Sequence, residues 1–196
     1  MIMSLYKKVA ITNRHIFAKK HEGDYAEYLG NLADYVDVII LREKDLTEEE
    51  YRKLAVSVLK KCEEKKADVV LHYFTDTALL LHAPGVHLPM DLFRRDHQKI
   101  AGLKYRGASV HSLEEAKEAQ NLGATYITFS HVFETDCKKG LKPKGLEALR
   151  QVCREISIPV YALGGIRDEN EEPVISAGAA GSCRMSDYMD RNDKEL

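Results

Sequence analysis

The sequence lacks the features that would direct the chain to a membrane or to nucleic acid. No apolar run approaches the roughly 18 residues that a membrane-spanning helix needs, and residues 1–11 have neither the apolar core nor the cleavage site of a signal peptide. The 29 basic and 31 acidic residues leave a net charge of −2, so no basic excess predicts nucleic-acid binding. We therefore expect a cytoplasmic protein that binds neither membrane nor nucleic acid.

Cysteine is also sparse, and its spacing excludes the common zinc motifs. The four cysteines form no CxxC pair; they are Cys62, Cys137, Cys153 and Cys183. Scattered thiols of this kind are typical of a reducing compartment rather than of a disulfide framework. The chain has 196 residues and is 44% hydrophobic, which is enough to bury one complete core, and we expect one domain over residues 1–196.

What the sequence does contain is a regular alternation of strand-like and helix-like segments. Strands are predicted at residues 9–12, 36–41, 69–73, 86–88, 107–110, 126–129, 158–163 and 182–185. Helices are predicted at residues 25–35, 47–65, 75–82, 91–101, 113–122, 144–155 and 168–177, with a polar turn after the first strand. Such alternation requires parallel strands joined by right-handed crossovers.

Eight such repeats in this length predict a small (β/α)₈ TIM barrel. An open doubly wound sheet is the alternative, but no glycine-rich nucleotide fingerprint follows the first strand. Only residues 186–196 follow the last strand, so we expect a shortened eighth helix. A neighbouring subunit could cover the flank of the barrel left open there, which makes a homo-oligomer possible.

Chemistry in a barrel of this kind belongs to the loops at the carboxyl ends of the strands. The loop after residues 126–129 opens with His131, whose imidazole titrates near neutral pH and suits proton transfer. The same loop carries Lys138 and Lys139, which either clamp a phosphate or form a solvated charge pair. Residues 72, 87 and 111 are also histidines near strand ends. Together they could bind a metal, but each alone is more commonly a structural histidine.

Two further places predict anion binding. Gly164-Gly165 follow the seventh predicted strand, where backbone N–H groups can approach a phosphate closely, with Met185-Ser186 as a second half. The alternative is that the two glycines serve only a tight turn.

Arg42 and Lys44 follow the second predicted strand and could bind an anionic group of a substrate, Arg42 in bidentate fashion. An ion-paired rim with Glu43 and Asp45 is an equally good interpretation, since surface pairs of this kind are common.

Three strings resemble a known family. They are HVFETDCKKGL at 131–141, SVHSLEEA at 109–116 and VHLP at 86–89. They resemble the thiamine phosphate synthase/TenI family, and within it the TenI branch of thiazole tautomerases. The resemblance runs from LREK at 41–44 to MS at 185–186. It implies a (β/α)₈ barrel that acts on a small phosphorylated thiazole.

The resemblance also separates two activities. The synthases couple a pyrimidine diphosphate to a thiazole phosphate with magnesium, and they carry an Asn-Asp pair where this chain has His72-Tyr73. They carry Gln where this chain has Ile40, and HLGQED where it has HLPMDL at 87–92. A divalent ion needs several hard oxygen ligands, and Tyr73 and Leu92 supply little for it. The resemblance therefore favours the tautomerase, an isomerase without a metal or another cofactor.

In that interpretation His131 moves the proton that makes the carboxythiazole aromatic. In the same interpretation Gly164, Gly165, Met185 and Ser186 hold the phosphate, with Lys138 as a clamp. We assign the carboxylate to Arg42 with Lys44 as a helper, and Ser109 orients the substrate.

Some positions depart from the family. Ser130 replaces a usual Gly, and Asp187 puts a negative charge near the expected phosphate. Arg184 either lies inside the barrel, where it needs an anion, or points outward as a surface residue. Two alternatives stay open: a magnesium-dependent thiamine phosphate synthase, and a catalytically degenerate barrel that binds a thiamine precursor or regulates a partner.

Overall fold

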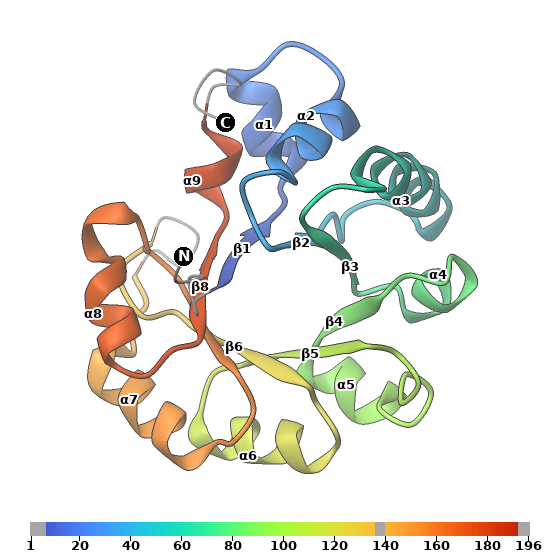
Figure 1. Ribbon diagram of the computed structural model, residues 1–196. Coiled ribbons are helices and arrows are strands. Elements are labelled where there is room, and N and C mark those ends of the chain that lie inside the picture. Colours follow the sequence, from blue (N-terminus) through green and yellow to red (C-terminus); the bar gives the residue numbers. More distant parts are fainter. Residues whose placement is uncertain (1–6, 136–139, 192–196) are drawn as a thin grey trace.

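A computed structural model of the protein describes residues 7–135 and 140–191. Its centre is a closed barrel of eight parallel strands that pair in chain order, with the last strand returning to the first (Figure 1). The strands are β1 (Lys7–Ile11), β2 (Val38–Leu41), β3 (Asp68–His72), β4 (Gly85–Pro89), β5 (Tyr105–Val110), β6 (Tyr126–Ser130), β7 (Val160–Leu163) and β8 (Gly181–Arg184). The predicted (β/α)₈ barrel is confirmed.

Helices surround the barrel on its outer face, as Figure 1 shows. They are α1 (Arg14–Lys20), α2 (Tyr25–Leu32), α3 (Glu48–Cys62), α4 (Thr75–Leu80), α5 (Met90–Asp96), α6 (Leu113–Asn121), α7 (Gly145–Glu155), the 3₁₀ helix η2 (Asp168–Asn170), α8 (Glu171–Ser176) and α9 (Ser186–Met189). No helix in the described ranges is long and apolar enough to cross a membrane. The cytoplasmic location stays a prediction.

Hydrophobic burial is divided between two layers because side chains alternate along each strand. In β2, Val38 and Ile40 point into the barrel, whereas Ile39 and Leu41 pack against the surrounding helices. Since both faces of the strand are covered, all four of its residues are buried. This explains why the strand appears in the sequence as an unbroken apolar run.

Several helix starts follow directly from local sequence. Thr47 and Glu50 form the predicted capping box of α3, and the Ser112 hydroxyl accepts from the Glu115 N–H at the start of α6. The predicted turn after the first strand is wrong, because α1 forms there. The Asn13 side chain accepts hydrogen bonds from the N–H groups of His15 and Ile16, which is an N-cap that the sequence displays.

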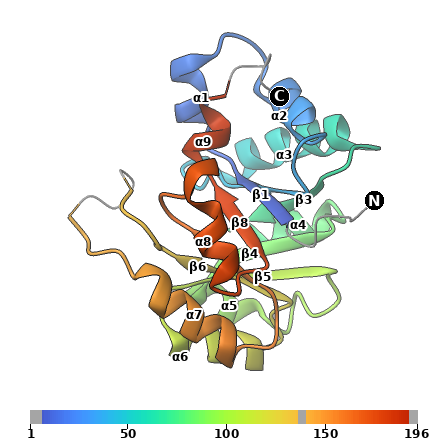
Figure 2. The same cartoon turned by 60° about the vertical axis from the view of Figure 1, so that its left-hand side comes forward.

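The eighth helix is short, as predicted, since α9 has four residues. However, the flank beside it is covered from within the chain. Helix α1 packs against α9, and the two lie side by side in Figures 1 and 2. The Tyr28 hydroxyl of α2 donates to the Tyr188 carbonyl, and both Tyr188 and Met189 are buried. The homo-oligomer stays a prediction, but it is not needed to cover this flank.

Candidate active site

An open cavity of about 1160 Å³ lies at the carboxyl ends of the strands. It brings together most of the predicted site residues, namely Arg42, Ser109, His131, Gly164, Gly165, Met185 and Ser186. Lys44 is exposed and does not line it. Lys138 lies outside the described residues.

The alternation of side chains explains why residues so distant in sequence meet here. Arg42 follows the inward-facing Ile40 by two positions, and His72 follows the inward-facing Val70 in the same way. The wall of the cavity is therefore the last inward-facing layer of the barrel.

The environment of Arg42 decides between its two interpretations. Glu43 and Asp45 do not pair with it; they pair with Arg14, whose Nη1 lies 3.3 Å from Glu43 Oε2 and whose Nη2 lies 2.7 Å from Asp45 Oδ2. Within the described ranges no carboxylate lies in ion-pair distance of the Arg42 guanidinium. The ion-paired rim is therefore built on Arg14, and Arg42 is left to face the cavity.

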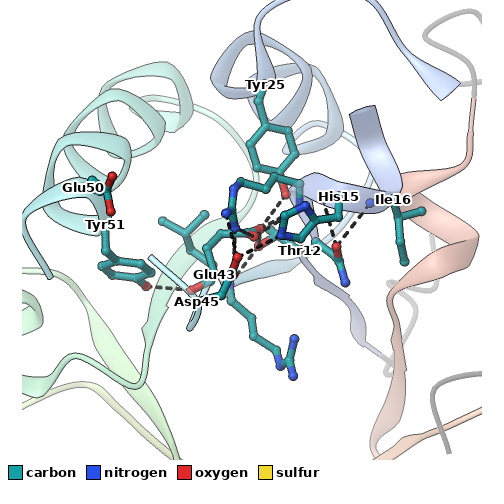
Figure 3. A network of polar contacts seen from close by, with 12 residues as sticks. Thr12, His15, Ile16, Tyr25, Glu43, Asp45, Glu50 and Tyr51 are labelled. Carbon is teal, nitrogen blue, oxygen red and sulfur yellow. Dashed lines mark hydrogen bonds and ion pairs between the residues drawn. The ribbon is translucent and has the colours of Figure 1, made fainter. Parts of the chain in front are cut away.

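Glu43 is the centre of this network and is 2% exposed. Its carboxylate accepts from the Thr12 hydroxyl at 2.7 Å, from the Tyr25 hydroxyl at 2.8 Å and from the Arg14 N–H at 3.1 Å (Figure 3). Burial, followed by the negative charge of Glu43, raises the pKa of Tyr25, so this phenol remains a donor. The Thr12 oxygen also accepts from the Arg42 N–H at 2.8 Å. The sequence showed no sign of this support for Arg42, because its members come from α1, α2 and the segments that follow β1 and β2.

The two glycines have a packing role whether or not they bind phosphate. Both have positive φ, +107° at Gly164 and +66° at Gly165. A Cβ at Gly164 would lie 2.4 Å from the Cβ of His131, and one at Gly165 would lie 2.3 Å from the Glu134 carbonyl. Only glycine allows the loop after β6 to lie this close to the end of β7.

His131 is held in the cavity wall by its own loop. It is 4% exposed, its Nε2 lies 3.2 Å from the Leu141 carbonyl, and its own carbonyl accepts from the Lys144 N–H at 2.9 Å. When Nε2 carries the proton and donates to Leu141, Nδ1 is left as the acceptor. His131 therefore lies in the cavity wall, and its catalytic role stays a prediction.

The four histidines do not form a metal site. His111 is exposed, and its Nδ1 lies 3.1 Å from the Ser130 hydroxyl. His72, His87 and His131 line the cavity. Across residues 7–135 and 140–191, no group of three or more His, Cys, Asp or Glu side chains is placed to hold an ion. The structural interpretation therefore fits His87 and His111.

Arg184 differs from both of its predicted positions. Its neighbour Cys183 faces the barrel interior, so Arg184 points outward, but it is 2% exposed and therefore not a surface residue. Its Nη1 lies 2.6 Å from Asp168 and 3.1 Å from Asp187, and its Nη2 lies 2.9 Å from Glu171. The negative charge of Asp187 is therefore paired with a buried guanidinium rather than left beside a ligand phosphate.

Comparisons with known proteins agree with this architecture. A family model described as Thiamine monophosphate synthase matches residues 9–187. The chain is 37% identical over 190 residues to the putative thiamine-phosphate synthase 2 of Aquifex aeolicus, which covers 96% of this chain and 100% of that protein. It is 36% identical over 161 residues to the thiamine-phosphate synthase of Halalkalibacterium halodurans, which covers 81% and 76%. The solved thiamine phosphate pyrophosphorylase from Pyrococcus furiosus has a TM-score of 0.80 at 29% identity, over 96% of this chain and 90% of that one.

These relatives overturn the predicted activity. They are named synthases and a pyrophosphorylase, which are transferases, whereas a tautomerase is an isomerase. The predictions of a thiazole tautomerase and of an isomerase are therefore wrong. They depended on three short strings and a few strand-end residues, whereas the similarity to synthases spans nearly the whole chain. From residue 9 to residue 187, the chain belongs to the thiamine monophosphate synthase (TMP-TENI) family.

Proposed function

We propose that this protein is a thiamine-phosphate synthase, which joins a pyrimidine diphosphate to a thiazole phosphate. The observation that carries the proposal is the Arg42 guanidinium, which lines the cavity with no carboxylate partner in the described ranges. The names of the relatives support the same reaction.

In this reaction the thiazole nitrogen uses its lone pair to form a bond to the methylene carbon of the pyrimidine. The bond from that carbon to the diphosphate oxygen breaks, and its electron pair leaves with pyrophosphate. Negative charge therefore develops on the leaving oxygen. A fixed guanidinium that binds the diphosphate stabilises this charge, and in a partly dehydrated cavity such an interaction is stronger than in water.

The remaining groups are assigned by position. The turn at Gly164-Gly165 and the neighbouring Met185-Ser186 line the same cavity and would take the phosphate of the thiazole. Ser109 and His131 lie in the wall between these two anion positions and would contact the rings. Lys138 stays a predicted clamp.

Magnesium does not fit the described residues. The Asp76 carboxylate after β3 forms an ion pair with Lys99, and Asp96 accepts from Arg95 at 2.7 Å and from Thr75 at 2.7 Å. Asp91, just after β4, is exposed and does not line the cavity. Tyr73 offers a phenol rather than a carboxylate. The chemistry that these residues supply is therefore binding and charge stabilisation by the protein itself.

The test is the formation of thiamine phosphate and pyrophosphate from the two substrates, with and without magnesium. We expect wild type to form product and Arg42→Gln to lose about 10²- to 10³-fold in kcat, as for removal of one stabilising donor group. Lys44→Gln is the matched control, since Lys44 is two positions away and does not line the cavity. No product from wild type at saturating substrates would refute the proposal and leave the binding-only alternative.

A further inference from the structure

His72 is a buried histidine whose hydrogen-bonding groups are not used within the described chain. It is the last residue of β3, is 7% exposed and lines the cavity. Its Nδ1 is buried without a partner, and in residues 7–135 and 140–191 no group is hydrogen-bonded to its Nε2. Buried polar groups are normally satisfied, so a ring left in this state needs an explanation.

The neighbouring His87 provides an internal comparison. The two residues are register partners on β3 and β4, and their rings stack with centroids 5.9 Å apart. His87 is fully satisfied: Nδ1 lies 3.1 Å from the Tyr126 hydroxyl, and Nε2 lies 2.8 Å from the Ser109 hydroxyl. Gly107 makes room for this arrangement, because a Cβ there would lie 2.3 Å from His87 Nδ1.

The fold therefore surrounds one histidine with partners and leaves the adjacent one open toward the cavity. Both rings sit at the same level of the same barrel, so burial alone does not account for the difference. The hydrogen-bond partner that His72 lacks on the cavity side is one that a bound ligand would supply.

The charge of the surroundings limits what that ligand group can be. Burial, followed by the nearby His87 and the cations Arg42 and Lys44, lowers the pKa of His72, so its imidazole is neutral at physiological pH. A neutral imidazole offers one donor and one acceptor. Such a pair suits an uncharged heteroaromatic nitrogen or its amino substituent better than a phosphate, for which Arg42 is the stronger partner.

Arg42 and His72 also lie next to each other. They directly follow Leu41 and Leu71, which are register partners on β2 and β3. Neighbouring strands are about 4.8 Å apart, so one ligand can place an anion on Arg42 and a ring on His72. A heteroaromatic ring joined to a diphosphate through one carbon has these two parts next to each other.

We propose that His72 is a specificity-determining residue that hydrogen-bonds the ring of the pyrimidine diphosphate while Arg42 binds its diphosphate. This inference depends on the proposed function for the identity of the substrate. The pyrimidine is assigned rather than the thiazole because the thiazole nitrogen must keep its lone pair for bond formation. The pyrimidine has ring nitrogens that take no part in the reaction.

The experiment measures binding by calorimetry, so it does not need turnover. The probes are the pyrimidine diphosphate, the thiazole phosphate and inorganic pyrophosphate. His72→Phe keeps an aromatic ring and removes both nitrogens, His72→Asn keeps a donor and an acceptor, and His111→Phe is the control at an exposed histidine outside the cavity.

We expect wild type to bind the pyrimidine diphosphate more tightly than pyrophosphate. His72→Phe should weaken pyrimidine diphosphate binding about tenfold, the effect of one hydrogen bond, with no change for pyrophosphate or thiazole phosphate. His72→Asn should recover part of the loss, and His111→Phe should have no effect.

Equal weakening for all three probes would overturn the inference, because His72 would then be structural. Equal affinity of wild type for pyrimidine diphosphate and pyrophosphate would also overturn it, because the ring would add nothing. If wild type makes no thiamine phosphate but shows the expected pattern of binding, the proposed function fails and the role of His72 stands.

Discussion

Replacing Glu43 by Gln is the sharpest test of the polar network beneath Arg42. Glutamine has nearly the same shape but presents one acceptor oxygen where glutamate presents two. Oε1 accepts from Thr12 and Tyr25, and Oε2 lies 3.2 Å from the Arg14 N–H and 3.3 Å from its Nη1. The amide nitrogen of glutamine would put a donor against at least one of these donors.

The magnitude follows from the lost bonds. Hydrogen bonds to a charged group contribute about 1.5–3 kcal/mol each. If the amide nitrogen replaces Oε2, the N–H and the Nη1 of Arg14 both lose this acceptor. The Arg14 N–H then keeps only a weaker hydrogen bond to the uncharged oxygen at the position of Oε1. We therefore expect Glu43→Gln to lower the free energy of unfolding by about 3 kcal/mol. For a chain of this length that corresponds to a fall in Tm of about 6–12 °C.

The assay is urea and thermal unfolding followed by circular dichroism. Asp45→Asn is the matched control, because it removes the exposed partner of the same arginine, and exposed pairs contribute little. Arg42→Gln should keep wild-type stability, since its side chain is not part of the network. A Glu43→Gln variant as stable as wild type, or no more affected than Asp45→Asn, would refute the reasoning.

Two further predictions concern the cavity wall. Gly164→Ala should destabilise the protein more than Gly123→Ala in thermal unfolding. Both glycines have positive φ, but only a Cβ at Gly164 would contact another residue, His131. Equal destabilisation by the two substitutions would show that backbone conformation alone matters. His87 should remain neutral in an NMR titration until the pH is far below 6.5, because burial lowers its pKa to about 3. Between about pH 6.5 and 3 the unfolded state then binds more protons than the folded state. The contribution of the neutral His87 to the free energy of unfolding is therefore fully present above pH 6.5 and is lost as the pH falls through this window. A His87 ring that titrates near 6.5 in the folded protein would contradict the burial argument.

The strands were predictable because burial on both faces leaves an unmistakable local pattern. A parallel strand covered by helices outside and by the barrel core inside is apolar at every position, as β2 shows. The helix starts at Thr47 and Ser112 were also predictable, because each capping hydrogen bond joins residues only three positions apart in the sequence. Helix α1 was missed although its Asn13 cap is equally local.

The position of the site was also predictable, because parallel strands place all their carboxyl ends at one mouth. The period of two along a strand is enough to bring Arg42, Ser109 and the end of β7 to a common cavity. The activity was not predictable from the same residues. Three short strings and a few strand-end residues resembled one branch of the family, whereas the comparison over nearly the whole chain supports the other.

The sequence by itself determined the barrel, the order of its strands and the set of polar residues at its mouth, because each depends on periodicity and chain direction. Only the tertiary structure decided how those polar residues are paired. Glu43 meets Arg14 instead of the adjacent Arg42, and Arg184 is buried against Asp168, Glu171 and Asp187. His72 and His87 are the same residue type at the same level of neighbouring strands, yet one is satisfied and the other is open. The physical reason is that a hydrogen bond depends on atoms a few ångströms apart in space, and the packing of distant segments alone fixes those distances.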